Sequence, residues 1–450
     1  MALRMLAALA LTTSLAASAQ TPSLPPNVIL PNNEGLPIGA LGGLEGNAFA
    51  ARVADSTAGY VNPAGLAATT ASSASISAGT FRFVTVSAEV SSNSSGSSVS
   101  QLPAAVGFVL KKPFGREDLS LGFSVARTAA WAQSSDAQIL TPGTLRSYTT
   151  FAADAAFNRT TVSIALGWNP GGAWRFGGGL LGDVLNLRNV QSLSYRAETG
   201  SYGRTAIASG RATGGQGILR LGLGTQADIS PEWKFGATLR TPGVQIVPSG
   251  FYAIDTLNQN GAASQQASFF DPEADFRYKV PWEAELGIAW VRPSYEIELN
   301  LKGQSGVSAY DGFSSAKSVL RVNDPGTGAP PVITVTPFPG VPFEARAILN
   351  VSVGGHIRLD EKGIWKLHAG FATDNSPVGD GDQFFNRTNL TSATIGVSGA
   401  AFHIAGSLGI SYQFGTTDEL TIPDIGGGTI SRSTYKISNI GILYSFSYIF

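Results

Sequence analysis

From residue 73 onward the chain alternates apolar and polar side chains with a period of two. This pattern limits the folds open to the chain more than any other feature. Runs of it lie within residues 118–127, 160–168 and 294–302. The last run places six apolar side chains on one face: Ile440, Ile442, Tyr444, Phe446, Tyr448 and Phe450. Such alternation predicts β-strands with one apolar and one polar face.

The composition indicates what the apolar face contacts. Charged residues make up 14% of the chain, well below the roughly 25% of soluble domains. After the N-terminal leader, no stretch offers the ~18 consecutive apolar residues of a transmembrane helix. We therefore expect a transmembrane barrel with its apolar face toward lipid. The absence of cysteine excludes disulfides and zinc–thiolate sites, and a net charge of −1 offers nucleic acid no basic surface.

Short and long connectors between the strands alternate. Six are short: 113–117, 169–173, 229–232, 291–294, 359–363 and a tight turn near Gly399-Ala400. Seven are long and polar: 91–100, 132–157, 188–215, 248–279, 303–343 (with room for an extra hairpin), 374–389 and 416–429. Thirteen connections predict an all-β, 14-stranded antiparallel barrel over residues 73–450, with short periplasmic turns and long outer loops. The expected strands are 73–90, 101–112, 118–131, 158–168, 174–187, 216–228, 233–247, 280–290, 295–302, 344–358, 364–373, 390–398, 401–415 and 430–450.

Cross-strand pairing gives the expected register of two hairpins. Glu283 faces Lys302 if the chain reverses at 291–294, and Lys111 faces Asp118 if it reverses at 113–117. Both registers place opposite charges inside the barrel and aliphatic side chains outside, as cross-strand pairs prefer. Four aromatic residues beside short turns fit an interfacial girdle: Trp168, Trp174, Trp290 and Tyr295.

The N-terminal 72 residues differ from the rest of the chain. Residues 1–19 are typical of a Sec signal peptide that is cleaved after Ala19. The prolines of residues 20–41 predict an extended periplasmic lead-in. Residues 42–67, named the hatch here, are rich in small residues and contain capping signals: Asn47 before 48–54, and Asn62 before Pro63. Helical turns this short need a container, so we expect residues 20–72 to place a helical hatch that plugs the barrel.

The hatch also carries a family resemblance. Ala54-Asp55 followed by Asn62-Pro63-Ala64-Gly65-Leu66 resembles the hatch of the FadL/TodX family of outer-membrane transporters of hydrophobic compounds. Three later segments are similar to the family in the same order: 216–250, 280–302 and 365–378. In the first of these, Leu239 stands where the family usually has an aromatic residue. The strand ending at Phe450 resembles the terminal strand of outer-membrane barrels in general.

The resemblance implies a site and a mechanism. Hatch-motif residues would be Asp55, Asn62, Pro63, Ala64 and Gly65. A hydrophobic ligand would be caught among outer loops, pass a pocket beside the hatch, and leave sideways near the third strand, about residues 118–131. In the 248–279 loop, candidate capture residues are Phe251, Tyr252, Phe269 and Phe270, which equally fit simple packing of that loop. We expect a monomer in contact with outer-membrane lipid and lipopolysaccharide, with no nucleic-acid partner.

The polar residues do not indicate catalysis. By alternation, His356, His368 and His403 face the lumen, without a nucleophile motif or metal spacing, and the glutamates fit an ion-paired lumen better than an acid–base pair. The expected lumen-facing polar residues are Glu283, Glu285, Lys302, His368 and His403. We expect no enzyme activity, cofactor or metal. Gly177-Gly178-Gly179 lies within a strand and fits close approach of the hatch.

Two other functions stay open at this stage. One is a structural or secretion-accessory barrel whose loops bind protein partners, and the other is a general porin. The sequence does not separate fatty acids from aromatic hydrocarbons as substrates, although an inward Arg or Lys near the hatch would favour a carboxylate.

Overall fold

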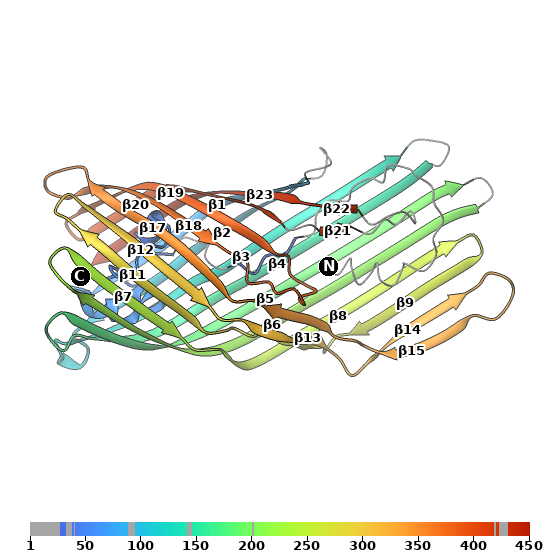
Figure 1. The fold of residues 1–450 in the computed structure, drawn as a ribbon, viewed down its shortest axis with the longest axis horizontal. Coiled ribbons are helices and arrows are strands. Elements are labelled where there is room, and N and C mark those ends of the chain that lie inside the picture. Colours follow the sequence, from blue (N-terminus) through green and yellow to red (C-terminus); the bar gives the residue numbers. More distant parts are fainter. Residues whose placement is uncertain are drawn as a thin grey trace.

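The computed structural model describes residues 28–32, 38–39, 41–88, 95–141, 146–199, 202–417, 420–422 and 431–450. The signal peptide and its cleavage site lie outside these residues. The described strands form one elongated antiparallel barrel, and its four longest strands run along it to the right-hand end in Figure 1. No helix among the described residues is long and apolar enough to cross a membrane.

Fourteen strands follow one another around the barrel wall, as predicted. They are β1 (Ser73–Ala88), β2 (Ser95–Lys111), β3 (Leu119–Thr141), β4 (Arg146–Trp168), β5 (Trp174–Thr199), β6 (Tyr202–Asp228), β7 (Trp233–Arg240), β11 (Glu283–Val291), β12 (Tyr295–Gln304), β17 (Ile348–Arg358), β18 (Trp365–Asp374), β19 (Thr388–Ala401), β20 (Ile404–Thr417) and β23 (Tyr435–Ile449). Each pairs with the next. The last strand, β23, pairs with β1 from Ser73↔Ile449 to Ala88↔Tyr435 and closes the ring.

Most of the predicted long loops are paired strands instead. β3, β4, β5 and β6 run for 23, 23, 26 and 27 residues, so the loops expected at 132–157 and 188–215 are largely wrong. Polar alternating segments still pair above the lipid, where their outward side chains meet water. The outer sheet continues from β6 through β8 (Val244–Asn260), β9 (Ala263–Asp271), β14 (Ser318–Asp324) and β15 (Val332–Pro337), and the β14–β15 hairpin lies within 303–343. Smaller sheets contain β10 (Asp275–Phe276), β13 (Val307–Ser314), β16 (Val341–Ala345), β21 (Leu420–Ile422) and β22 (Ser431–Ser433).

The wall has the predicted faces, but both hairpin registers are shifted by two residues. Glu285, not Glu283, pairs with Lys302, and Lys111 pairs with Ser120 instead of Asp118. A shift of two residues leaves every side chain on its predicted face. Aliphatic residues of β4 to β6 point outward and are about half exposed, as a lipid-facing surface requires. At the short-turn end, the Trp233 and Trp290 rings stack with centroids 6.2 Å apart, and the Trp290 and Tyr295 rings meet edge to face.

The hatch contains three short helical turns: η1 (Gly42–Glu45), α2 (Ala58–Val61) and η2 (Pro63–Ala68). A fourth, η3 (Pro113–Gly115), lies in the first short turn of the wall. Asn47 does not cap a helix over 48–54. Its backbone is left-handed, with φ 63°, and its Oδ1 accepts a hydrogen bond from the Ile38 backbone N–H, 3.0 Å away. The side chain therefore ties the hatch to the segment before it.

Candidate functional site between the hatch and the barrel wall

Asn62 anchors the second half of the hatch. Its side chain is fully buried, and its Nδ2 donates to the backbone oxygens of Ala50 at 2.9 Å and Thr225 of β6 at 3.0 Å. Its Oδ1 accepts from the Ala64 N–H at 3.2 Å, which is the predicted N-cap, with Pro63 at the first helical position. One side chain thus caps η2, ties it to the rest of the hatch and binds both to the wall.

The other motif residues lie in the same hatch. Ala64 is buried, and a Cβ at Gly65 would stand 2.3 Å from the Val53 backbone oxygen. Asp55 is partly exposed, and its carboxylate accepts hydrogen bonds from the Thr57 N–H and hydroxyl. Asp55 therefore caps the turn that leads into α2.

Inward-facing glycines of the wall make room for the hatch backbone. A Cβ at Gly177 would lie 2.2 Å from the Pro63 carbonyl carbon, whereas Gly178 faces away and Gly179 meets Ala165 of the neighbouring strand. On the opposite side, a Cβ at Gly354 or Gly370 would lie 1.9 or 2.1 Å from the backbone of Glu45. The hatch thus approaches the wall more closely than any side chain allows.

Arg52 is the charged centre of the hatch. Its guanidinium contacts Glu45 of the hatch at 2.5 Å and two glutamates of β12, Glu298 at 2.8 Å and Glu296 at 3.4 Å. Glu298 also accepts a hydrogen bond from the Ala51 N–H at 2.8 Å. The side chains of Arg52, Glu45 and Glu298 are all buried, so this ion-pair network is screened very little.

Two histidines of the wall bind the same glutamate. Nδ1 of His356 and Nδ1 of His368 lie 2.9 and 2.7 Å from Oε1 of Glu45, and Nε2 of His368 lies 2.7 Å from the Ser398 hydroxyl. Burial raises the pKa of the Glu45 carboxyl, but both imidazoles and Arg52 outweigh that effect and hold it well below its usual range. His368 faces inward, as expected. The expectation for His403 is wrong, because the turn is at 402–403 instead of Gly399-Ala400, and His403 is exposed there. The small residues 399–401 gave no signal that distinguished strand from turn.

A second buried ion-pair cluster lies on the other side of the hatch. Arg220 contacts Asp183 at 2.8 Å and Glu283 at 3.1 Å, and Arg240 contacts Glu283 at 3.3 Å. Arg240 also donates to the backbone oxygens of Tyr60 and Val61 in the hatch and lies over the Tyr60 ring. The predicted lumen residue Glu283 is therefore buried between arginines.

Arg159 is the third arginine of this cluster. Its Nε donates to the Thr128 hydroxyl at 2.9 Å. Its Nη2 is buried without a hydrogen-bond partner, and the Glu283 carboxylate lies 3.9 Å away. Arg220 and Arg240 already balance Asp183 and Glu283, so Arg159 leaves the cluster with one excess positive charge.

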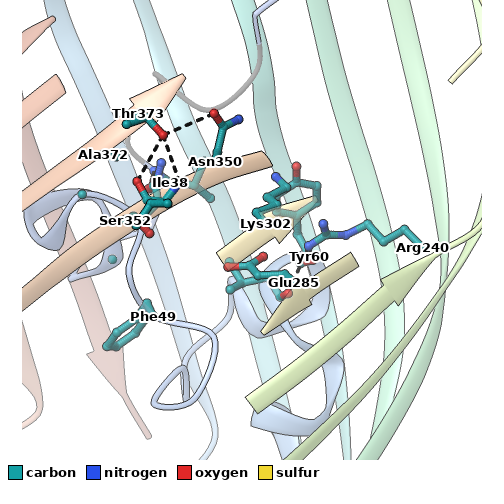
Figure 2. Close-up of a pocket in the computed structure, with 15 residues that line it drawn as sticks. Ile38, Phe49, Tyr60, Arg240, Glu285, Lys302, Asn350, Ser352, Ala372 and Thr373 are labelled. Atoms are coloured by element: carbon teal, nitrogen blue, oxygen red, sulfur yellow. Dashed lines mark hydrogen bonds between the residues drawn. The ribbon is translucent and has the colours of Figure 1, made fainter. Parts of the chain in front are cut away.

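A small cavity separates the hatch from the wall (Figure 2). Phe49 and Tyr60 of the hatch contribute to its lining. Glu285 and Lys302, both predicted to face the lumen, line it together with Arg240, and Figure 2 shows Tyr60 beside these three and Phe49 apart from them. A second group of wall residues completes the lining: Asn350, Val351, Ser352, Ala372 and Thr373. The cavity thus combines ring faces with charged groups beside the hatch.

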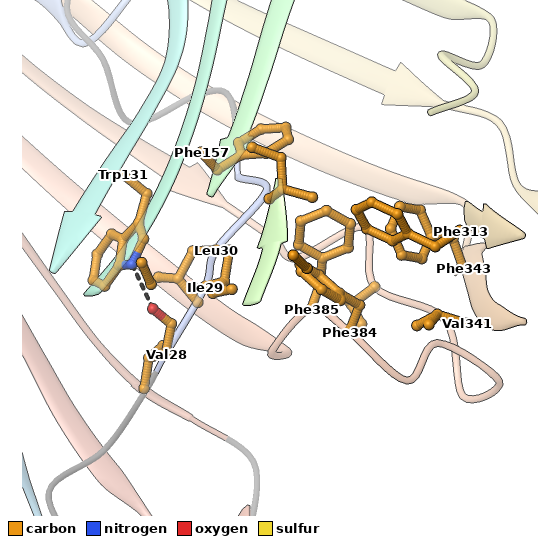
Figure 3. Packing of buried hydrophobic residues seen from close by; sticks show 14 of the residues in the cluster. Val28, Ile29, Leu30, Trp131, Phe157, Phe313, Val341, Phe343, Phe384 and Phe385 are labelled. Atoms are coloured by element: carbon orange, nitrogen blue, oxygen red, sulfur yellow. Dashed lines mark hydrogen bonds between the residues drawn. The ribbon is translucent and has the colours of Figure 1, made fainter. Parts of the chain in front are cut away.

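A buried aromatic cluster fills the barrel beyond the hatch (Figure 3). We name its members the aromatic cluster: Trp131, Phe157, Tyr252, Phe269, Phe276, Phe313, Phe343, Phe384 and Phe385. Tyr252 and Phe269 belong to it, and their rings lie 6.1 Å apart. Phe251 and Phe270 pack edge to face on the other side of the sheet, and Phe270 is 60% exposed. The four candidate capture residues therefore form two separate pairs, on strands instead of a loop.

Residues 28–30 pack into this cluster. Trp131 Nε1 donates to the Val28 oxygen at 2.6 Å (Figure 3). Asn386 Oδ1 accepts from the Ile29 N–H at 2.7 Å. Val28, Ile29 and Leu30 are almost completely buried. For these residues the expected periplasmic lead-in is wrong. The proline-rich composition did not indicate that three consecutive apolar residues would find partners inside the barrel.

The ladder between β2 and β3 is incomplete. It runs from Lys111↔Ser120 only to Ala105↔Ala126, although β2 continues to Ser95 and β3 to Thr141. Above this point β2 pairs with β1 and β3 pairs with β4. The β3–β4 register also shifts between Arg127 and Ala129. The wall therefore has a seam at the third strand.

No family model and no curated protein matches the chain. Solved structures do match it. The chain is similar to the CymD monoaromatic hydrocarbon channel, with 14% identity, a TM-score of 0.51, and coverage of 93% of this chain and 99% of that chain. It is also similar to a Pseudomonas aeruginosa FadL homologue, with 12% identity, a TM-score of 0.57, and coverage of 94% of this chain and 99% of that chain. The P. putida toluene transporter TodX matches with 12% identity, a TM-score of 0.56, and coverage of 92% of this chain and 99% of that chain. The chain has the fold of these channels.

Sequence reasoning missed the two hatch charges, and it did not pair them with the wall residues that contact them. Glu45 and Arg52 are charged residues in a segment of small ones, seven positions apart. A charge that the fold buries needs a partner, so this pair was a detectable signal. Arg159, Asp183 and Arg220 lie on the neighbouring strands β4, β5 and β6, and the sequence gives no sign that they meet.

Proposed function

We propose that this protein is an outer-membrane transporter of the FadL/TodX type that takes up hydrophobic small molecules passively. The observation that carries the proposal is the aromatic cluster, an apolar interior enclosed by the barrel above a buried hatch. A molecule that buries about 300 Å² of apolar surface there gains roughly 7 kcal/mol at 25 cal/mol per Å². An aqueous pore offers no such gain.

The proposed route has three parts. The ligand is captured at the outer end, near the exposed side of β8 and β9, and enters the aromatic cluster. It then reaches the cavity beside the hatch, where movement of the hatch admits it. It leaves sideways through the seam above Ala105 and Ala126, where β2 and β3 no longer pair. This exit lies within the predicted third-strand segment. The buried hatch argues against a general porin.

We further propose that the ligand carries a carboxylate, as a long-chain fatty acid does. Arg159 lies two residues from Phe157 of the aromatic cluster on the same inward face of β4. Its Nη2 has no hydrogen-bond partner, and its cluster has one excess positive charge. An acidic head group would satisfy both, while the alkyl chain packs among the rings. Toluene offers no group that would pair with this charge.

The test measures the uptake of oleate and of toluene by cells that lack the gene for this protein. These cells are complemented with the wild type or with single variants. We expect Arg159→Met to lower oleate uptake at least tenfold and to leave toluene uptake unchanged. The control is Arg188→Met, since Arg188 pairs with Asp154 on exposed strands and should affect neither probe. Equal uptake of oleate by both variants would contradict the carboxylate assignment. Failure of the wild type to restore uptake of either probe would contradict transport itself and favour a role in binding protein partners.

A further inference from the structure

We propose that Glu45, His356 and His368 form a binding site for a divalent transition-metal ion that fastens the hatch to the barrel wall. The site is separate from the transport route described above, and it adds a ligand of a different chemical class. Two of its residues belong to the wall and one to the hatch, so an ion bound there links the two parts directly.

The three ligand atoms already converge. His356 and His368 are direct cross-strand partners on β17 and β18, and their ring centroids are 5.1 Å apart. One ring nitrogen of each histidine and a Glu45 carboxylate oxygen all lie within 4.8 Å of one another, and both Nδ1 atoms contact Oε1 of Glu45. Zinc binds imidazole nitrogen and carboxylate oxygen at about 2.1 Å, which places ligands of a tetrahedral ion roughly 3.4 Å apart. The 2.7 and 2.9 Å separations would open by roughly 0.5–0.7 Å to admit the ion.

The charge around these atoms favours a cation. Arg52 contacts three carboxylates, those of Glu45, Glu296 and Glu298. Three carboxylates and one guanidinium thus meet two imidazoles in a site where five of these six side chains are at most 3% exposed. Uncompensated buried charge is costly, and one divalent cation cancels it.

The surrounding contacts suit metal ligation. Arg52 binds Oε2 of Glu45 and leaves Oε1 for the ion. A neutral imidazole that ligates through Nδ1 carries its proton on Nε2, which then needs an acceptor. For His368 that acceptor is the Ser398 hydroxyl, 2.7 Å away. For His356, Nε2 is buried without a hydrogen-bond partner, and Oε1 of Glu296 lies 3.8 Å away. A small shift of that carboxylate would complete the second contact.

The experiment titrates tag-free, full-length mature protein in detergent with Zn²⁺ and Co²⁺ after treatment with a chelator. The chain has no cysteine and three histidines, so other transition-metal sites contribute little background. We expect one equivalent by calorimetry and a visible Co²⁺ spectrum typical of nitrogen and oxygen ligands. His356→Gln, His368→Gln and Glu45→Gln should each weaken binding at least 100-fold. Ser398→Ala, which keeps all three ligands, should weaken it about tenfold.

His403→Gln is the matched control, because His403 lies in an exposed turn and should leave binding unchanged. Heat-modifiable gel mobility shows which variants have folded, and Ser398→Ala keeps the test decisive if a ligand variant fails to fold. Metal should also slow hydrogen exchange of residues 42–47 in the wild type. Absence of one-equivalent binding in folded wild type would overturn the proposal and leave a purely hydrogen-bonded cluster. Binding that survives both wall-histidine variants, or that disappears in His403→Gln, would overturn it too.

Discussion

Gly177 and Gly178 of β5 provide a matched test of how tightly the hatch is seated. A Cβ at Gly177 would lie 2.2 Å from Pro63, whereas at Gly178 the nearest atom is the flexible end of Leu223 at 3.4 Å. For Gly177→Ala to reach the same 3.4 Å, the hatch must retreat by the difference, about 1.2 Å. Overpacking of this kind costs about 1–3 kcal/mol, which raises the population of a displaced hatch roughly 5- to 150-fold.

Two measurements report the displacement. Hydrogen exchange should accelerate in residues 58–68 of Gly177→Ala, and single-channel recordings in planar bilayers should show more frequent openings. Gly178→Ala should match the wild type in both, because its new methyl group points to the lipid-facing side. If the two variants behave alike, with both folded by heat-modifiable mobility, the close approach of the hatch to β5 is not a seat and the reasoning is wrong.

Two further predictions concern single side chains. Asn62→Ala removes the donor to the Ala50 and Thr225 oxygens and the acceptor of the Ala64 N–H, although the Ala50 oxygen keeps its hydrogen bond from Gln226. We expect a loss of about 1–3 kcal/mol, measured by urea unfolding in micelles; an unchanged midpoint would show that Asn62 is not an anchor. In the 375–387 loop, burial raises the pKa of Asp382 from 3.8 to about 6. Because the folded loop binds this proton more tightly than the unfolded chain, ionisation opposes folding, and lowering the pH from 7 to 4 should stabilise the loop by about 2 kcal/mol. Hydrogen exchange across this range tests the sign, and Asp382→Asn should abolish the effect.

The barrel was predictable because its signal is repeated in every strand. The alternation predicts which side chains face the lipid. The two-residue error in the predicted register around 291–294 moved no side chain to the other face of the wall, because side chains alternate with a period of two. In the outer halves of β3 to β6, the alternating positions are polar instead of apolar. The sequence of these segments therefore resembles that of loops.

The site was only partly predictable. Asn62 and Pro63 carry a local capping signal, and the structure shows the cap. The contacts of Glu45 with His356 and His368 join residues more than 300 positions apart, and no local pattern specifies such a meeting. The same holds for the packing of Ile29 among residues of distant strands and loops.

The central claim is that residues 42–67 close a barrel whose interior accepts apolar molecules. Single-channel recordings of the wild type and of a variant lacking residues 42–67 test it most directly, with heat-modifiable mobility as the check that the barrel has formed. We predict almost no conductance for the wild type and a large, steadily open channel for the deletion, which would also lose its preference for apolar solutes. A folded deletion variant with no gain in conductance would contradict the claim.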